Sequence, residues 1–373
     1  MRAPGLVTGV DHDRHQLAYA GLSIVRQCKF GGDRSPVRPL SRARYAQMTG
    51  AYSFLYRRMV RVPKRWLNYG EQASLLAERG LTVEDHDSAA EFLSVTNYYR
   101  LSGYFRYWQR DPLNGDNRFI AGASFNAIRD LYLAEQALGV ACDEILRPIE
   151  VMFRTRFAHS YAELVGPVGV FAVGEGFTQP PDLNHGLVHD HALSNLDRSK
   201  EPFIGHYREE IKTGRHYDPA AYAQMPIWVA VEAFTFGTIS RLITASGKSG
   251  VLDAIAESLG VSRATLPSQV RSFVYLRNRV AHSSRLWNHS VLDVPGLLPN
   301  TSRRAKRNHR QFDDHSIYKI FVALEYVARG ANLDDDWLSR VVDPILDHNR
   351  LLAAGICTPK KFGQMSTGVL VSS

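Results

Sequence analysis

The sequence predicts a globular all-α protein, and two patterns support this fold class. From residue 69 onward, apolar residues recur every three or four positions in one segment after another, which is the spacing of a buried helix face. No alternation of apolar and polar residues is sustained over several segments, as a sheet would require. Of the 373 residues, 45% are apolar, which is enough to bury a sizeable core.

The first predicted helix corresponds to the segment YGEQASLLAERGL, which begins at residue 69. Its alanine and leucine residues group on one side, and Gly80 is a normal helix stop. A second, shorter helix is predicted over about 87–96 and leads into the aromatic block YYRLSGYFRYW.

The longest predicted helical segment begins at Ser124, a suitable N-cap. Apolar residues continue at helical spacing as far as Phe157. Because proline lacks an N–H group and clashes with the preceding turn, Pro148 predicts a break or kink. We therefore expect a pair of helices with buried faces on the two sides of this proline.

The second half of the chain combines an irregular insertion with further helices. Residues 166–200 are rich in Gly, Pro, His and Asp, which predicts irregular structure. The segment MPIWVAVEAFTFGTISRLITA then predicts one strong helix, with Pro226 in its first turn and three aromatic residues in the core: Trp228, Phe234 and Phe236. The remaining predictions are helices over about 250–260 and 267–287, a polar loop over 291–315, and a final pair from SIYKIFVALEYVARG and DDWLSRVVDPILDHNRLLAAG.

The formal charge of +8 is concentrated near the N-terminus. Residues 1–58 hold 10 Lys+Arg and 3 acids, a charge of +7, which leaves 8 − 7 = +1 for the rest of the chain. The basic excess therefore does not predict a nucleic-acid surface across the folded body. We expect a basic extension at 1–58, a helical domain at 59–351 with the insertion at 166–200, and a C-terminal tail at 352–373. The extension is either a disordered arm that touches nucleic acid or the result of a translation start placed before Met59.

Several protein classes are excluded by composition. No stretch approaches the roughly 18 unbroken apolar residues of a membrane span, so no membrane partner is expected. Asp11 and Asp13 precede any apolar region, which excludes a secretory signal. Cys28, Cys142 and Cys357 are too few and too scattered for a zinc cage or a disulfide framework. These features indicate a protein of the reducing cytoplasm with no cofactor.

A histidine cluster in the insertion is the one candidate for a metal site. It comprises His185, His189 and His191 with Asp182 and Asp190 nearby. Because no second cluster has comparable spacing and the segment resembles a loop, we assign no metal site.

The string VYLRNRVAHSSRLWN carries the residues that best fit a chemical reaction: Arg277, Asn278 and His282. Histidine transfers protons near neutral pH, and arginine supplies a permanent planar cation for the charge on a phosphorane, so the pair provides the minimum chemistry of a ribonuclease. On a helix Asn278 and His282 share a face, and Arg277 borders it. A solvated polar face is the alternative, since the same spacing recurs in three other pairs: Arg154/His159, Arg304/His309 and Arg310/His315.

Several blocks of the chain, in order, resemble the Abi-like abortive-infection family of bacteria, the AbiD/AbiF group. The resemblance covers about 67–350 and rests on YGEQASLLAERGL, NYYRLSGYFRYW, FNAIRDLYLAEQAL, RPIEVMFRTRFAHSYAELVG, EPFIGHY, MPIWVAVEAFTFGTISRL and LRNRVAHSSRLWN. Members of this family are similar to HEPN-fold proteins, which are all-helical ribonucleases. The resemblance therefore implies a HEPN-like helical bundle with additional helices and the irregular insertion.

The same resemblance implies roles for the residues of the string. In the HEPN pattern an arginine is followed by a polar residue, often asparagine, then by three residues and a histidine. His282 is then the general base or acid, Arg277 the transition-state cation, and Asn278 the group that orients the phosphate or His282. HEPN sites are usually composite, and one matching motif occurs here, which implies a homodimer. Arg154 and His159 could instead supply a second half-site within one chain, although a threonine follows Arg154.

Three further groups have two interpretations each. Glu150 and Arg154 lie four apart, which favours a helix-stabilising ion pair over a catalytic role. The aromatic block around Arg100 could stack unpaired bases, but core and turn packing around Gly103 is favoured. One basic cluster in the expected loop is either simply solvated or an RNA-backbone contact: Arg303, Arg304, Lys306, Arg307 and Arg310.

Taken together, the residues and the resemblance predict a toxin-like, metal-independent endoribonuclease that acts in phage defence. Its substrate would be RNA, and an unknown trigger or antitoxin-like partner would control it. A non-catalytic RNA-binding module and a helical dimerisation or adaptor protein are the alternatives. The first retains RNA binding without cleavage, and the second has no salt-dependent RNA affinity.

Overall fold

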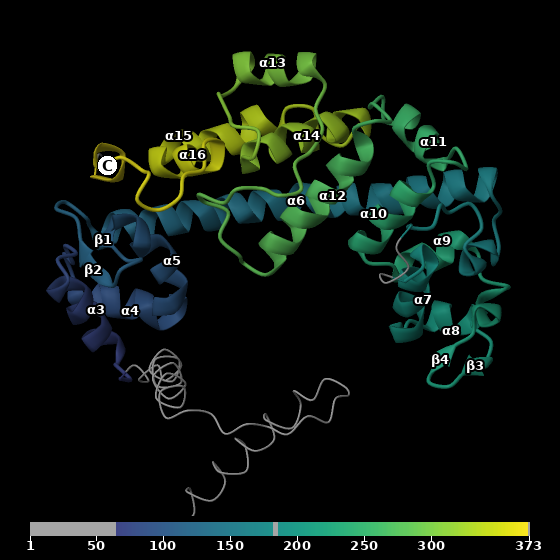
Figure 1. Cartoon of the computed structure of the whole chain (residues 1–373), viewed down its shortest axis with the longest axis horizontal. Helices are drawn as coiled ribbons and strands as arrows, with labels where there is room; N and C mark the ends of the chain where they lie inside the picture. The colour runs from purple at the N-terminus through teal and green to yellow at the C-terminus, as the bar shows by residue number, and fades with distance from the viewer. Residues whose placement is uncertain (1–64, 182–185, 372–373) are drawn as a thin grey trace, which may run out of the picture. The chain divides into compact units, whose positions relative to one another are not determined.

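A computed structural model describes residues 65–181 and 186–371 (Figure 1). The predicted extension at 1–58 and the alternative start at Met59 lie outside these residues. The described chain is mostly helical and contains only two small two-stranded sheets, which confirms the all-α fold class. Its residues from Leu67 onward form one compact unit.

The unit begins with three short helices and a small hairpin. Helix α3 (Tyr69–Glu78) starts at a reciprocal capping box, in which the Asn68 side chain accepts from the Glu71 N–H and the Glu71 carboxylate accepts from the Asn68 N–H. The helix ends before Gly80, which adopts a φ of 88° that suits glycine. The following elements are α4 (His86–Thr96), α5 (Tyr98–Trp108), β1 (Gln109–Asp111) and β2 (Asp116–Phe119).

Helix α6 (Phe125–Leu164) is one continuous helix of 40 residues, capped by Ser124 as predicted. The predicted break near Pro148 is therefore wrong. Apolar side chains on both sides of this residue, among them Ile145 and Ile149, are buried on one face, while Pro148 itself is exposed. Because Pro148 has no N–H group, the carbonyl of Glu144 has no helical hydrogen-bond partner. Glu144 is exposed, so this carbonyl lies on the solvated side of the helix, and the burial of the opposite face outweighs the local cost of proline.

The expected insertion at 166–200 contains regular structure as well as loops. Between a 3₁₀ helix (Val170–Val173) and α8 (Pro202–Tyr207) lies α7 (Val188–Arg198), which buries Leu196. A second hairpin, β3 (Lys212–Thr213) and β4 (His216–Tyr217), and a 3₁₀ helix (Pro219–Tyr222) follow.

The strong helix predicted from MPIWVAVEAFTFGTISRLITA is divided. It forms α9 (Ile227–Ala230), a 3₁₀ turn (Val231–Ala233) and α10 (Phe236–Ala245). The new helix starts because Thr235 caps it, and the Asn195 side chain accepts the Thr235 N–H at 2.8 Å. As a result Trp228 on the short α9 is 53% exposed, so its predicted core position is wrong. Phe234 and Phe236 are buried as predicted.

Helix α11 (Val251–Ser258) precedes α12 (Leu266–Ala281), which ends six residues earlier than predicted. The chain turns because Ser283 adopts a left-handed φ of 47°. The polar loop predicted over 291–315 contains a helix, α13 (Pro299–Asn308), so that prediction is wrong for this part. The second helix of the final pair is also divided, and the remaining elements are α14 (Ile317–Gly330), a π-helix (Leu338–Val342), α15 (Asp343–His348), α16 (Arg350–Cys357) and α17 (Thr367–Val371).

Helix α6 organises the unit, because α5, α9, α10, α11, α12, α15 and α16 all contact it. Figure 1 shows it as a single long helix behind α12 and below α14 and α16. Near its N-terminal half, Trp287 packs between Tyr104 and Trp108 of α5 and donates its indole N–H to the Leu351 carbonyl at 2.6 Å. Most of the aromatic block of α5 thus forms core, although Tyr99 is 68% exposed, and the chain beyond α12 packs against the buried part. Within the expected tail, Leu370 is buried and its carbonyl accepts the indole N–H of Trp108 at 2.9 Å.

Candidate functional site at the end of helix α12

The sequence-predicted triad occupies the C-terminal end of α12. Arg277 and Asn278 lie in its last turns, and His282 is the C-cap residue, whose backbone N–H donates to the Asn278 carbonyl at 3.1 Å. Asn278 and His282 are exposed, and the side chain of Arg277 is 33% exposed. All three residues are therefore open to a ligand rather than enclosed in the core.

Arg277 is held by a two-point contact with α6. Its Nε donates to Oε2 of Glu150 at 3.1 Å, and its Nη2 donates to Oε1 at 3.3 Å. The remaining terminal nitrogen, Nη1, donates to Oδ1 of Asn278 at 3.1 Å. Because Glu150 is only 12% exposed, the pair is partly shielded from water and fixes the plane of the guanidinium.

The same carboxylate also binds Arg154. Nη2 of Arg154 donates to Oε1 of Glu150 at 2.5 Å and to the Phe234 carbonyl at 3.0 Å, so the predicted Glu150–Arg154 ion pair is present. His159 is exposed further along α6. Among the interactions of the described residues, none joins His159 to Arg154 or to Arg277. Glu150 therefore connects two arginines, and Arg154 is directed toward that carboxylate.

The turn after His282 brings in a residue from α5. The Ser283 carbonyl accepts from Nη1 of Arg100 at 2.5 Å, and the Ser283 N–H donates to the Val280 carbonyl at 2.8 Å. Arg100, predicted as an RNA contact, is exposed and adjoins the backbone next to His282. Helix α5, which carries the aromatic block, thus contacts the turn that follows Arg277, Asn278 and His282.

Glu135 of α6 anchors the chain beyond this turn and was missed by sequence reasoning. Its carboxylate is 3% exposed and accepts the N–H groups of Leu286 and Trp287, the latter at 3.0 Å, and the hydroxyl of Tyr104. Burial raises the pKa of Glu135, although these donors and Arg285 act in the opposite direction. One feature of the sequence could have indicated this role: Glu135 lies four residues after Leu131, within the apolar stripe of the predicted helix.

A cleft of about 840 Å³ adjoins the same turn, between α6 and the end of α12. Its acidic residues include Asp143 and Glu144, and Nε of Arg147 donates to Asp143 at 2.7 Å. Apolar lining comes from Val140, which is 61% exposed, and from Val280. The acidic lining repels phosphate, so a polyanion is better accommodated on the side of Arg277, Asn278 and His282.

Comparison with known proteins places these features in a family. A family model of Abi-like proteins matches residues 91–288, more than half of the chain. This chain belongs to the Abi-like family of abortive-infection proteins. The matched segment of the Abi-like protein contains α5, α6 and α12, together with Arg277, Asn278 and His282. No curated protein and no solved structure matches the chain.

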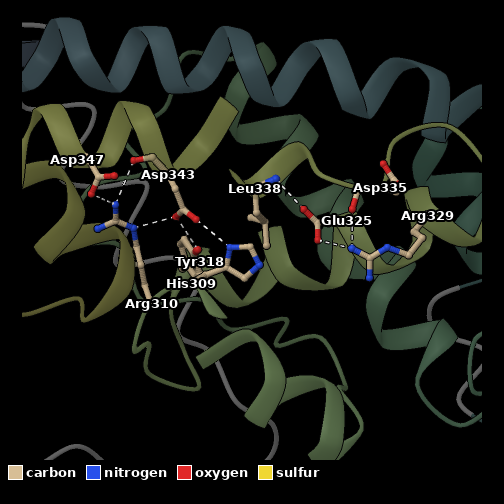
Figure 2. A network of polar contacts seen from close by, with 9 residues as sticks. All are labelled: His309, Arg310, Tyr318, Glu325, Arg329, Asp335, Leu338, Asp343 and Asp347. Carbon is tan, nitrogen blue, oxygen red and sulfur yellow. Dashed lines mark hydrogen bonds and ion pairs between the residues drawn. The ribbon is translucent and has the colours of Figure 1, made fainter. Parts of the chain in front are cut away.

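The members of the basic cluster of the Abi-like protein differ in their surroundings. Arg310 is bound by two acids: its Nε donates to Oδ1 of Asp343 at 2.9 Å, and its Nη2 donates to Asp347 (Figure 2). Lys306 lies over the Phe312 ring at 4.9 Å. The other three cations, Arg303, Arg304 and Arg307, are exposed on α13, and not in a loop as predicted.

Within the described part of the chain, the only grouping with metal-ligand proximity is Asp334, Asp335 and Asp336. Arg340 pairs with Asp334 and with Asp336, so these carboxylates already have a cationic partner. Of the histidine cluster considered in the insertion, His185 and Asp182 lie outside the described residues. None of the described helices has the length and apolarity needed to cross a membrane.

Proposed function

We propose that this Abi-like protein is a toxin-like endoribonuclease of abortive infection whose reaction takes place at the end of α12. The observation that supports this most strongly is the arrangement around Arg277. Glu150 holds one edge of its guanidinium, while Asn278 and His282 are left exposed beside it. A cation of fixed orientation next to an accessible histidine is what phosphodiester cleavage by a 2′-hydroxyl requires.

In the proposed reaction a neutral His282 imidazole accepts the proton of the 2′-hydroxyl. The 2′-oxygen then forms a bond to the adjacent phosphorus, and the bond between phosphorus and the 5′-oxygen breaks. A protonated histidine donates a proton to that leaving oxygen, which yields a 2′,3′-cyclic phosphate and a 5′-hydroxyl. Arg277 stabilises the negative charge on the phosphorane, so proton transfer and charge stabilisation are both assigned to side chains, and the proposed reaction is metal-independent.

Asn278 and Glu150 have positioning roles in this proposal. Oδ1 of Asn278 accepts from Arg277, which directs the amide NH₂ group of Asn278 to donate elsewhere, and a phosphate oxygen is a suitable acceptor. Glu150 restricts the rotamers of Arg277 at a separation of 127 residues in sequence. Its one negative charge is shared between Arg154 and Arg277, so the three side chains together keep a net positive charge that attracts phosphate.

We also propose that the active form is a homodimer with a composite site. One histidine cannot act as base and acid in the same displacement, and each chain supplies one His282 to the proposed site. A second copy related by a twofold axis brings a second His282 and Arg277. The exposed position of these residues and the partly apolar cleft next to them, with Val140 at its surface, support such a contact.

The proposed setting is the bacterial cytoplasm, where cellular RNA is the substrate. An active nuclease would halt its own host, so an unidentified trigger or antitoxin-like partner is proposed to control it. The acidic lining of the cleft supports one second candidate function, docking of another protein in an adaptor role without catalysis.

Cleavage of total RNA in EDTA tests the proposal against its alternatives. We expect wild type to cleave and His282→Ala to lose cleavage while it keeps its melting temperature and RNA binding. His86→Ala is the matched control, because His86 is also exposed but lies on α4. Loss of cleavage in His159→Ala would instead favour a half-site within one chain. Wild-type binding without cleavage favours the RNA-binding module, and neither binding nor cleavage favours the adaptor.

A further inference from the structure

Helix α13 presents an arc of positive charge on a regular scaffold. Its sequence, PNTSRRAKRN, contains four cations and no acid. At about 100° per residue, Arg303 and Arg307 lie on the side opposite Ala305, while Arg304 and Lys306 flank them. Ala305 is 6% exposed and faces the body of the protein, so the arc of cations faces outward. In Figure 1 this helix stands apart from α6, beyond α14.

A dedicated polar network fixes the end of this helix. His309, the residue after α13, places Nδ1 2.9 Å from Oδ2 of Asp343, and the next residue, Arg310, binds the other carboxylate oxygen. The hydroxyl of Tyr318 also donates to Asp343 at 2.8 Å, as Figure 2 shows. The segment after α13 is therefore anchored to α14 and α15, and α13 is not a freely moving loop.

The outward arginines of α13 form a group with no acidic partner, unlike three other exposed arginines of the described chain. Arg118, Arg263 and Arg340 are each at least 55% exposed, and each forms an ion pair with one or more aspartates. Arg303 instead donates to the Pro299 carbonyl at 3.4 Å, and Arg307 donates to Oδ1 of Asn308 at 3.4 Å. Neither they nor Arg304 pair with a described carboxylate. Compensation of the helix dipole accounts for cations in the last turn, but not for Arg303 and Arg304 earlier in α13.

We propose that α13 is an RNA-anchoring surface that binds backbone phosphates through Arg303, Arg304 and Arg307. The identification of the polyanion as RNA rests on the proposed function. An anionic membrane is a poorer fit, since a helix that lies in a bilayer surface needs a face of large apolar residues, and α13 has only Ala305, which faces inward. Charges placed on a regular helix without base-stacking aromatics predict binding that depends on phosphate and little on sequence.

This surface has a consequence for substrate length. RNA that reaches both α13 and the end of α12 gains affinity from the anchor, whereas a short oligonucleotide at His282 does not. The anchor therefore lowers KM for long RNA and leaves kcat unchanged.

The test compares two triple variants in the His282→Ala background, so that RNA is not consumed. One removes the anchor: Arg303→Gln, Arg304→Gln and Arg307→Gln. The control removes the same charge from paired sites: Arg118→Gln, Arg263→Gln and Arg340→Gln. The probe is a long single-stranded RNA, titrated at several salt concentrations, with vesicles of anionic phospholipid as a second probe. Thermal melting verifies that both variants are folded.

For single strands each phosphate contact contributes about 0.7 to the slope of log K against log salt, so loss of three contacts lowers the slope by about 2. The anchor's contribution to affinity then changes about 20-fold between 50 and 200 mM salt. We expect this loss in the α13 variant and not in the control. Equal slopes in the two variants overturn the proposal, and so does a loss of vesicle binding with RNA binding intact. If the α13 variant loses RNA binding but wild type does not cleave RNA, only the proposed nuclease activity is refuted. The anchoring surface is not, because binding is measured in the His282→Ala background without cleavage.

Discussion

Replacement of Glu150 by glutamine tests the way in which Arg277 is positioned. The substitution keeps the shape of the side chain but removes the charge that two guanidinium groups share. One carboxylate oxygen becomes an NH₂ group, which faces donors instead of accepting from them. Arg277 then loses its two-point contact, and its guanidinium is free to rotate away from Asn278.

The expected magnitude follows from burial. Removal of one partner from a fully buried ion pair costs about 3–5 kcal/mol. Glu150 is 12% exposed, but Arg277 is 33% exposed, so water screens part of the interaction. We therefore expect the free energy of unfolding to fall by about 2 kcal/mol, which for a unit of this size lowers Tm by about 4 °C. Loss of orientation lowers kcat by about 10- to 100-fold.

The assay combines thermal melting with the kinetics of RNA cleavage. Because the variant carries one more net positive charge, its KM for RNA should stay equal or fall while kcat falls, a split that simple unfolding does not produce. Glu163→Gln is the matched control, since it makes the same change at an exposed position of α6. If Glu150→Gln melts and cleaves as this control does, Glu150 does not position Arg277 and the reasoning is refuted.

Three further predictions concern the same region. Arg277→Lys keeps the charge but not the planar fork, and we expect kcat to fall about 100-fold with RNA affinity nearly unchanged; an equal loss in both would indicate only a binding role. Because burial raises the pKa of Glu135, its charged form costs stability that increases as pH rises above about 4.5. Melting at pH 5 and pH 8 should therefore show Glu135→Gln gaining on wild type as pH rises. Glu135→Leu should lose about 3 kcal/mol at pH 5, because three donors become unpaired, and less at pH 8, where the charged carboxylate destabilises wild type. Parallel curves for wild type and the glutamine variant would contradict this. Val140→Asp should convert the proposed dimer into a folded monomer and abolish cleavage, as sedimentation velocity would show, and an active monomer would exclude the composite site.

The order and type of most elements could be predicted from local patterns, because caps and apolar stripes are local. Ser124 and Gly80 mark helix ends where the structure has them. The failures arise where distant contacts decide. Burial of α6 against the rest of the unit carries it through Pro148, and Asn195 accepts the Thr235 N–H that starts α10 forty residues away. Helix α13 escaped prediction because a helix that buries one alanine has no apolar periodicity.

The candidate site was predictable to a similar extent. The spacing of Arg277, Asn278 and His282 is visible in the sequence, and the structure brings Arg100 to the same turn. The spacing of Glu150 and Arg154 predicted their ion pair, yet nothing local indicated that Glu150 also binds Arg277 across 127 residues. Partners that belong to another helix require the packing of α6 against α12, which a single sequence does not specify.

The chemical identity of the RNA ends is the measurement that tests the central claim most directly. Purified wild type should cut RNA in the presence of EDTA and leave 2′,3′-cyclic phosphate and 5′-hydroxyl ends, and His282→Ala should produce none of them. Ends that carry a 3′-hydroxyl and a 5′-phosphate, or cyclic-phosphate ends that persist in the His282 variant, would contradict the assignment of this chemistry to the end of α12.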